Sequence, residues 1–168
     1  MSVDISSFTL QEALSIAIQA EKRSESVYEK LLNAVQNFVM RDKLTFLINE
    51  EKKHQRILES MYAKLFPKKD LLKRELSLVP ELNIDVDNET QVTDLLEMAM
   101  QSEKAFEEFY DLLSQEVEER KVAHLLAYLS SMEHGHYFLI KGEYDLCVED
   151  ETYYERDTFD YDMVHIGP

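Results

Sequence analysis

Apolar residues recur every three to four positions along four long segments of the chain, with polar and charged residues between them. This period is typical of amphipathic α-helices. The first segment begins at Thr9, which forms a capping-box pattern with Glu12, and the others cover about 40–65, 91–117 and 120–146. The apolar stripes of the first two helices comprise Leu14, Ala17, Ile18, Tyr28, Leu31 and Val35, and then Leu44, Leu47, Leu58 and Leu65.

Only the connection between the second and third helices is long. Residues 67–90 contain two prolines and a polar run, whereas the other two connections are short and predict antiparallel hairpins. A connector of this length can return along the bundle, so the second and third helices are expected to run parallel. We predict an all-α four-helix bundle over 1–146 with one long crossover. The acidic, aromatic tail at 147–168 is expected to pack against its own bundle or a second subunit.

The two helical hairpins also repeat in sequence. A shift of 82 residues lays 17–32 over 99–114 with 7 of 16 positions identical, and the same shift lays 44–54 over 126–136. One offset that aligns both helix pairs indicates an internal duplication of a hairpin.

Two Glu-x-x-His motifs lie at this same offset, Glu51 with His54 and Glu133 with His136. Residues three apart are neighbours on one helix face. Two further carboxylates, Glu21 and Glu103, are also related by the shift, and each lies within an apolar stripe where a lone charge is costly to bury. We therefore expect these six side chains to converge from four helices.

Four ionised carboxylates in a low-dielectric interior repel strongly, so a counter-charge is required. Two divalent cations would balance them. A set of carboxylates with two imidazoles suits iron or manganese better than calcium or structural zinc. Of the other histidines, His124 and His134 are expected away from this face and His165 falls in the tail. Gly135 either lets a helix or a solvent path approach the ligands or is simply tolerated.

The motifs AIQAE at 17–21, EKKH at 51–54, AMQSE at 99–103 and EHGH at 133–136 resemble those of the rubrerythrin-like branch of the ferritin superfamily. The resemblance spans about 10–146 and implies a ferritin-like four-helix bundle that holds two iron ions, with manganese or a mixed pair as alternatives. It also implies that Glu51 and Glu133 bridge the metals, that Glu21 and Glu103 are terminal ligands, and that His54 and His136 each bind one metal. Family members reduce peroxide, oxidise Fe(II) or activate dioxygen.

Two departures from the family pattern bear on activity. Rubrerythrins carry a further glutamate three residues after the first one on helix three, where this chain has Phe106. They also usually end in a cysteine-rich electron-transfer module, whereas this chain has Cys147 alone. Any electron donor is therefore expected to be a separate protein.

Several residues are candidates to support the ligands. Tyr28 and Tyr110 lie seven residues after Glu21 and Glu103, so each hydroxyl is placed to hydrogen-bond a ligand carboxylate or relay an electron, although a tyrosine on an apolar stripe is often simply core. Glu25 and Glu107, one turn past the terminal ligands, are secondary candidates to orient a histidine or to bind metal in a second state, although glutamates at a stripe edge more commonly pair with Lys or Arg. Glu50 is a secondary candidate to orient a histidine, but its repeat partner is Met132.

The net charge of −16 argues against a nucleic-acid partner. The single cysteine excludes an intramolecular disulfide, and neither a leader nor a membrane-spanning apolar run is evident, so we expect a cytoplasmic protein. The leading hypothesis is an oxidoreductase whose small-molecule substrate is peroxide, dioxygen or Fe(II), in a small assembly such as a homodimer. The alternatives are ferritin-like iron oxidation and storage, or a binding module in which the metals are only structural.

Overall fold

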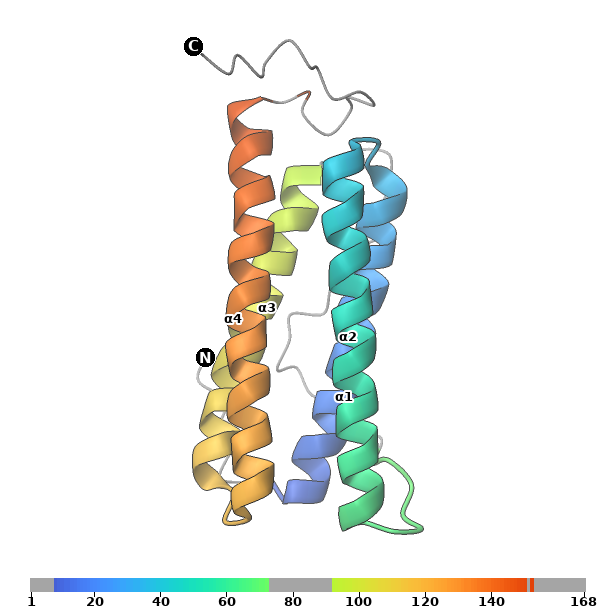
Figure 1. The fold of residues 1–168 in the computed structure, drawn as a ribbon, viewed down its shortest axis with the longest axis vertical. Helices are drawn as coiled ribbons and strands as arrows, with labels where there is room; N and C mark the ends of the chain where they lie inside the picture. Colours follow the sequence, from blue (N-terminus) through green and yellow to red (C-terminus); the bar gives the residue numbers. More distant parts are fainter. Residues whose placement is uncertain (1–7, 73–91, 151, 153–168) are drawn as a thin grey trace, which may run out of the picture.

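Four long helices make up the described part of the computed structural model, which comprises residues 8–72, 92–150 and 152 (Figure 1). They are α1 (Leu10–Ala34), α2 (Phe38–Leu65), α3 (Val92–Glu116) and α4 (Arg120–Glu149). No strand occurs among these residues. The all-α prediction is confirmed, and the predicted helices agree with the observed ones to within a few residues.

Side chains at the helix starts satisfy backbone groups that the helices leave free. At α1 the predicted capping box is present: Thr9 Oγ1 accepts from the Glu12 amide at 3.3 Å, and Glu12 Oε2 accepts from the Thr9 amide at 2.9 Å. At α2 the side chain of Asn37 accepts from the Met40 amide, and at α4 the side chain of Glu119 accepts from the Val122 amide. Each hairpin loop is thus only a few residues long.

The chain runs up α1 and down α2, and then down α3 and up α4 (Figure 1). Helices α2 and α3 are therefore parallel, as the long crossover predicted, and each hairpin packs mainly within itself. Most of the connector predicted at 67–90 lies outside the described residues, as do position 151 and 153–168 of the tail. None of the four described helices is long and apolar enough to cross a membrane.

One boundary differs from the prediction. Helix α4 continues to Glu149, about one turn beyond the predicted end at 146, and the N–H of Asp150 still bonds the carbonyl of Leu146 at 3.0 Å. The buried positions Ile140, Glu143 and Cys147 keep the helical register through this turn. The polarity of the segment concealed this continuation, because only one face of the last turn is buried.

Two apolar clusters fill the bundle, one towards each end. The first includes Leu14, Ile18, Leu58 and Leu126, and the second includes Leu31, Leu44, Leu47, Leu95 and Ile140. Every helix contributes to both clusters. Between its two contributions, each helix carries the glutamate or Glu-x-x-His motif that the sequence analysis singled out, so the fold places a polar layer between two apolar ones.

Candidate metal centre

All six predicted ligand side chains lie buried in this polar layer. Helices α1 and α3 contribute one carboxylate each, and α2 and α4 each contribute a glutamate and a histidine one turn apart. None is more than 3% exposed: Glu21, Glu51, His54, Glu103, Glu133 and His136. The apolar clusters on either side hold these helix faces together.

The six residues form two overlapping groups of four. Glu21, Glu51, His54 and Glu133 make the first, and Glu51, Glu103, Glu133 and His136 make the second. Within each group, one candidate ligand atom per residue lies within 4.8 Å of all the others. Glu51 and Glu133 belong to both groups, so each is placed to serve two adjacent ion sites.

The histidines direct the same ring nitrogen into the cluster. His54 Nδ1 lies 3.3 Å from Glu21 Oε2 and 3.1 Å from Glu133 Oε1. The two imidazole rings are stacked, with centroids 5.4 Å apart and planes 16° apart.

The second histidine repeats this arrangement. His136 Nδ1 lies 3.1 Å from Glu51 Oε1, 3.1 Å from Glu133 Oε2 and 3.5 Å from Glu103 Oε2. The sequence duplication is therefore matched by an approximate two-fold symmetry of the site.

Several buried oxygens in this layer lack a hydrogen-bond donor among the described residues. They are both carboxylate oxygens of Glu51, Oε1 of Glu133 and Oε2 of Glu103. Some of them lie close to a histidine nitrogen, but not in hydrogen-bonding geometry. Buried polar atoms are normally paired, so these oxygens fit ligands for cations.

Comparison with known proteins agrees with this donor set. The family model for rubrerythrin matches residues 12–144. The chain belongs to the rubrerythrin family. A hypothetical protein from Pyrococcus furiosus has a similar structure, with a TM-score of 0.72 and 30% sequence identity over 87% of this chain and 94% of that one. No curated protein sequence matches the chain.

The rubrerythrin-family cluster has the electrostatics of a site that needs positive charge. Burial, followed by repulsion from Glu133, raises the pKa of Glu51 well above its usual value. Burial also raises the pKa of Glu103 to about 8. Burial alone would lower the pKa of His54, but the nearby carboxylates of Glu133, Glu21 and Glu51 raise it to about 12. Protons held by these groups therefore supply the counter-charge without metal.

The pKa of Glu133 shifts in the opposite direction, below its usual value. Burial would raise its pKa, but the nearby imidazoles of His136 and His54 outweigh burial and lower the pKa to about 2. Burial would lower the pKa of His136, but the nearby carboxylates of Glu103, Glu133 and Glu51 outweigh burial and raise it. The shared carboxylate thus stays ionised while the two imidazoles hold protons.

Two buried tyrosines each hydrogen-bond a candidate ligand on the opposite hairpin. Tyr28 on α1 donates a hydrogen bond to Glu103 Oε1 on α3, and Tyr110 on α3 donates to Glu21 Oε1 on α1. Burial is the main cause that raises the pKa of both phenols. Each hydroxyl therefore stays protonated and donates to a carboxylate of the opposite hairpin, a pairing that spacing along one helix did not indicate.

The secondary candidates form ordinary polar pairs at the edge of the bundle. Glu25 accepts from Gln55 at 2.7 Å and pairs with Lys52 at 3.2 Å. Glu107 pairs with Lys104 at 3.0 Å and with His134 at 3.0 Å. Glu50 pairs with Lys53. The contacts of Glu25 and Glu107 are the edge ion pairs that the alternative interpretation anticipated.

The remaining predictions concern α4. His124 and His134 are exposed, as expected from their helix face. Gly135 is exposed too, and a methyl group added there would meet nothing within 4 Å. No other described helix approaches Gly135, so the interpretation that this glycine lets a neighbouring helix of the bundle come close to the ligands is wrong.

Sequence reasoning missed a further buried carboxylate, Glu143. It is 3% exposed, and one of its oxygens pairs with Lys43 of α2 while the other has no hydrogen-bond partner among the described residues. Its position seven residues after His136 places it on the same face of α4, two turns away. That spacing was the available signal, but the repeat gave Glu143 no carboxylate counterpart.

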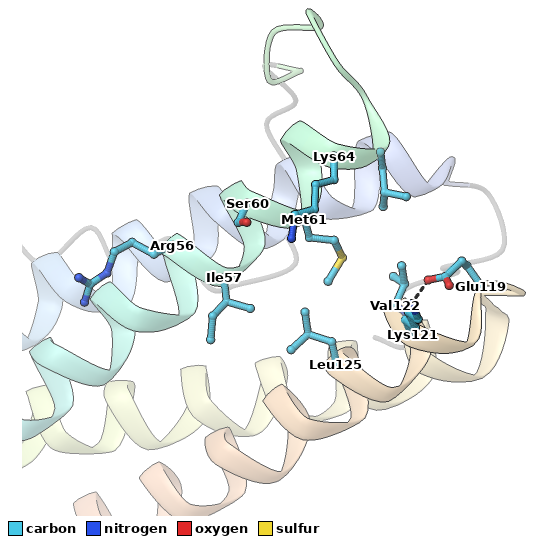
Figure 2. A pocket seen from close by; sticks show the side chains of 10 residues that line it. Arg56, Ile57, Ser60, Met61, Lys64, Glu119, Lys121, Val122 and Leu125 are labelled. Atoms are coloured by element: carbon cyan, nitrogen blue, oxygen red, sulfur yellow. Dashed lines mark hydrogen bonds between the residues drawn. The ribbon is translucent and has the colours of Figure 1, made fainter.

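A groove of about 670 Å³ opens between α2 and α4 beyond the polar layer (Figure 2). Its apolar lining includes Ile57, Met61, Leu65, Val122 and Leu125. None of the six candidate ligands lines it. The cations Arg56, Lys64 and Lys121 also line it, and none of these three forms an ion pair with another described residue.

Proposed function

We propose that this rubrerythrin-family protein is a di-iron oxidoreductase that reacts with peroxide or dioxygen, with manganese or a mixed pair as alternative metals. The observation that carries the proposal is the pair of overlapping ligand groups that share Glu51 and Glu133. Ligands that are oxygen-rich and include one imidazole per ion favour iron or manganese. The buried carboxylate oxygens that lack a hydrogen-bond donor carry negative charge, and two such ions would neutralise it.

The residues divide into three roles. Glu51 and Glu133 would hold both ions, Glu21 and His54 would complete one site, and Glu103 and His136 would complete the other. A bound iron pair supplies the electrons and the Lewis acidity that cleavage of an O–O bond requires.

The protein around the ligands keeps their geometry and protonation fixed. Tyr28 and Tyr110 hold the terminal carboxylates Glu103 and Glu21 by hydrogen bonds from the opposite hairpin. Burial raises the pKa of both phenols, so each stays protonated and remains a hydrogen-bond donor to its carboxylate. The apolar clusters on both sides exclude bulk water, which strengthens each of these interactions.

Electrons must come from outside the described bundle. Its one cysteine, Cys147, is buried, and burial followed by the nearby charge of Glu143 raises the pKa of its thiol to about 11. Such a thiol is unreactive at neutral pH. We therefore infer that a separate donor protein, or Fe(II) itself, reduces the centre.

Metal binding and oxidation test the proposal directly. The purified protein should bind two iron ions per chain and, on oxidation, develop the near-ultraviolet absorption of an oxo-bridged ferric pair. Glu51→Gln should abolish this absorption, because it removes one shared carboxylate, whereas Glu50→Gln next to it should not. A fully occupied centre in Glu51→Gln would contradict the ligand assignment.

Two other outcomes separate the alternatives. A metal that is redox-silent and unchanged by peroxide would mean that the ions only staple the bundle. A particle of roughly twenty or more subunits in light scattering would favour iron storage, because storage requires a closed shell. Peroxide-dependent oxidation of the centre in a small assembly would support the oxidoreductase.

A further inference from the structure

The groove between α2 and α4 lies where the two hairpins of the bundle meet (Figure 2). Ile57 and Met61 of α2 point towards Leu125 of α4, and Leu65 and Val122 extend the apolar lining to the end of the bundle. Its volume of about 670 Å³ is within the range of pockets that bind small molecules. Because water is displaced from apolar surface at a gain in free energy, this lining favours an occupant with an apolar part.

The same groove carries positive charge, although the chain is acidic. Arg56 and Lys64 line it from α2, and Lys121 lines it from α4. With 34 acidic residues against 18 Lys and Arg in the chain, surface cations are expected to have acidic neighbours. Yet Glu119 is the one acid among the described lining residues, and its carboxylate accepts from the Val122 amide at 2.8 Å, which holds it at the start of α4. The groove therefore has a local excess of positive charge.

The two lysines stand on opposite walls at one end of the groove. Lys64 is the last residue but one of α2 and Lys121 is the second residue of α4, so both lie at the same end of the bundle (Figure 1). Ile57 lies seven residues before Lys64, which is about 10 Å along the helix axis. An anionic group held between the lysines would leave roughly this length of apolar lining for an attached chain.

The described start of the crossover leaves the groove open. The carbonyl of Leu72 accepts from Gln19 Nε2 at 3.0 Å, and its amide donates to Ser15 Oγ at 3.2 Å, both on α1. The hydroxyl of Tyr62 donates to the carbonyl of Asp70 at 2.6 Å. These contacts hold residues 70–72 on the α1 side of α2, whereas the groove lies on its α4 side.

We propose that this groove binds an anionic amphiphile with a carboxylate head and a medium-length alkyl chain, such as decanoate. The carboxylate lies between Lys64 and Lys121, where charge-assisted hydrogen bonds hold it. The alkyl chain lies along Ile57, Met61 and Leu125, which removes apolar surface from water on both partners. None of the six candidate ligands lines the groove, so the proposal does not rest on the chemistry of the metal centre.

Titration calorimetry with the metal-loaded full chain tests the class of ligand. Affinity should rise about fourfold for each methylene added from hexanoate to decanoate, because each one is buried against the lining. Decanol, with the same chain and no charge, should bind more weakly, and decylammonium more weakly still. A protein of charge −16 that merely adsorbed amphiphiles would prefer the cation. Equal binding of decanoate and decanol, or a preference for decylammonium, would overturn the proposal.

Charge variants test the position of the head group. The double variant Lys64→Gln, Lys121→Gln should weaken decanoate binding at least about tenfold and leave decanol binding unchanged. The double variant Lys22→Gln, Arg23→Gln removes the same charge from exposed positions of α1 and should bind decanoate as the native protein does. Undiminished binding in the first variant, or an equal loss in the second, would exclude the lysine pair as the carboxylate site.

Leu125 tests the position of the chain. Leu125→Gln puts an amide into the lining and should weaken decanoate binding about tenfold, whereas Leu125→Met conserves volume and should retain it. A Leu125→Gln protein that keeps full helicity and native affinity would contradict the proposal. If that variant loses helicity, the lysine variants, which change exposed positions, still decide the matter. Iron binding should be unchanged in the lysine variants, so this proposal and that of the metal centre can fail separately.

Discussion

Tyr28 of α1 donates its hydroxyl hydrogen bond to Glu103 of α3, a residue 75 positions away in the chain. Tyr110 and Glu21 make the equivalent contact under the approximate two-fold symmetry of the site. The two hairpins therefore hold each other's terminal carboxylates, so the positions of the candidate ligands depend on how the hairpins dock. This relationship links the stability of the bundle to the affinity of the proposed centre.

Removing one of these hydroxyls should affect both properties. Tyr28→Phe leaves a buried carboxylate oxygen without its donor, which should cost about 1–3 kcal/mol of metal-free stability. Loss of an outer partner of a metal ligand should also weaken iron binding about 10–100-fold. Denaturant unfolding and iron titration measure the two effects. Tyr137→Phe, whose hydroxyl makes no hydrogen bond to a described residue, should change neither value, and equal effects in both variants would contradict this role.

The stability of the metal-free protein should fall as pH rises from mildly acidic to neutral. Glu103 has a pKa of about 8 in the folded protein against 4.5 as an ordinary carboxyl, so within this window the folded chain holds a proton that the unfolded chain has lost. The raised pKa of His54, about 12 against 6.5, extends the decline above neutrality.

Iron or manganese should reverse this dependence, because protons compete with the metal for the same oxygens and nitrogens. Thermal melting of metal-free and reconstituted protein across this pH range measures the difference. The stabilisation by metal should grow towards neutral pH and vanish in the Glu51→Ala, Glu133→Ala double variant. If the stabilisation by metal is independent of pH, or is retained in the double variant, these residues do not form the site.

Replacing one member of the Lys43–Glu143 ion pair should lower the stability of the protein more than replacing both members. Lys43→Met leaves the carboxylate of Glu143 buried without its cation and should cost about 1–3 kcal/mol of stability. The double variant Lys43→Met, Glu143→Leu should recover most of this loss, because it buries no charge. Chemical unfolding of the three proteins gives the comparison, and additive losses would exclude a direct interaction.

The apolar clusters should tolerate little loss of volume. Leu126 is fully buried in the first cluster, so Leu126→Ala should lower the free energy of unfolding by about 2–5 kcal/mol. Leu112 is 45% exposed on α3, and Leu112→Ala should cost far less. Urea unfolding measures both variants, and similar losses would contradict the assigned core.

The sequence by itself determined the helices, their connectivity and the six residues of the candidate centre. Burial of one helix face imposes a local period, so Leu14, Leu44 and their neighbours can be placed from spacing alone. The offset of 82 residues made Glu21 with Glu103, and each Glu-x-x-His with the other, recognisable as equivalent positions. Duplication carries information about tertiary contacts that a single motif does not have.

Tertiary structure alone decided which partners meet across the bundle. Tyr28 lies two turns from Glu21 on one helix, yet it bonds Glu103, because the relative axial position of two helices follows from side-chain packing and not from either helix's own period. The burial of Glu143, the extra turn of α4 and the exposure of Gly135 depend on the same packing. Spacing fixes the face of a helix on which a residue lies, whereas only the docked helices determine what that face meets.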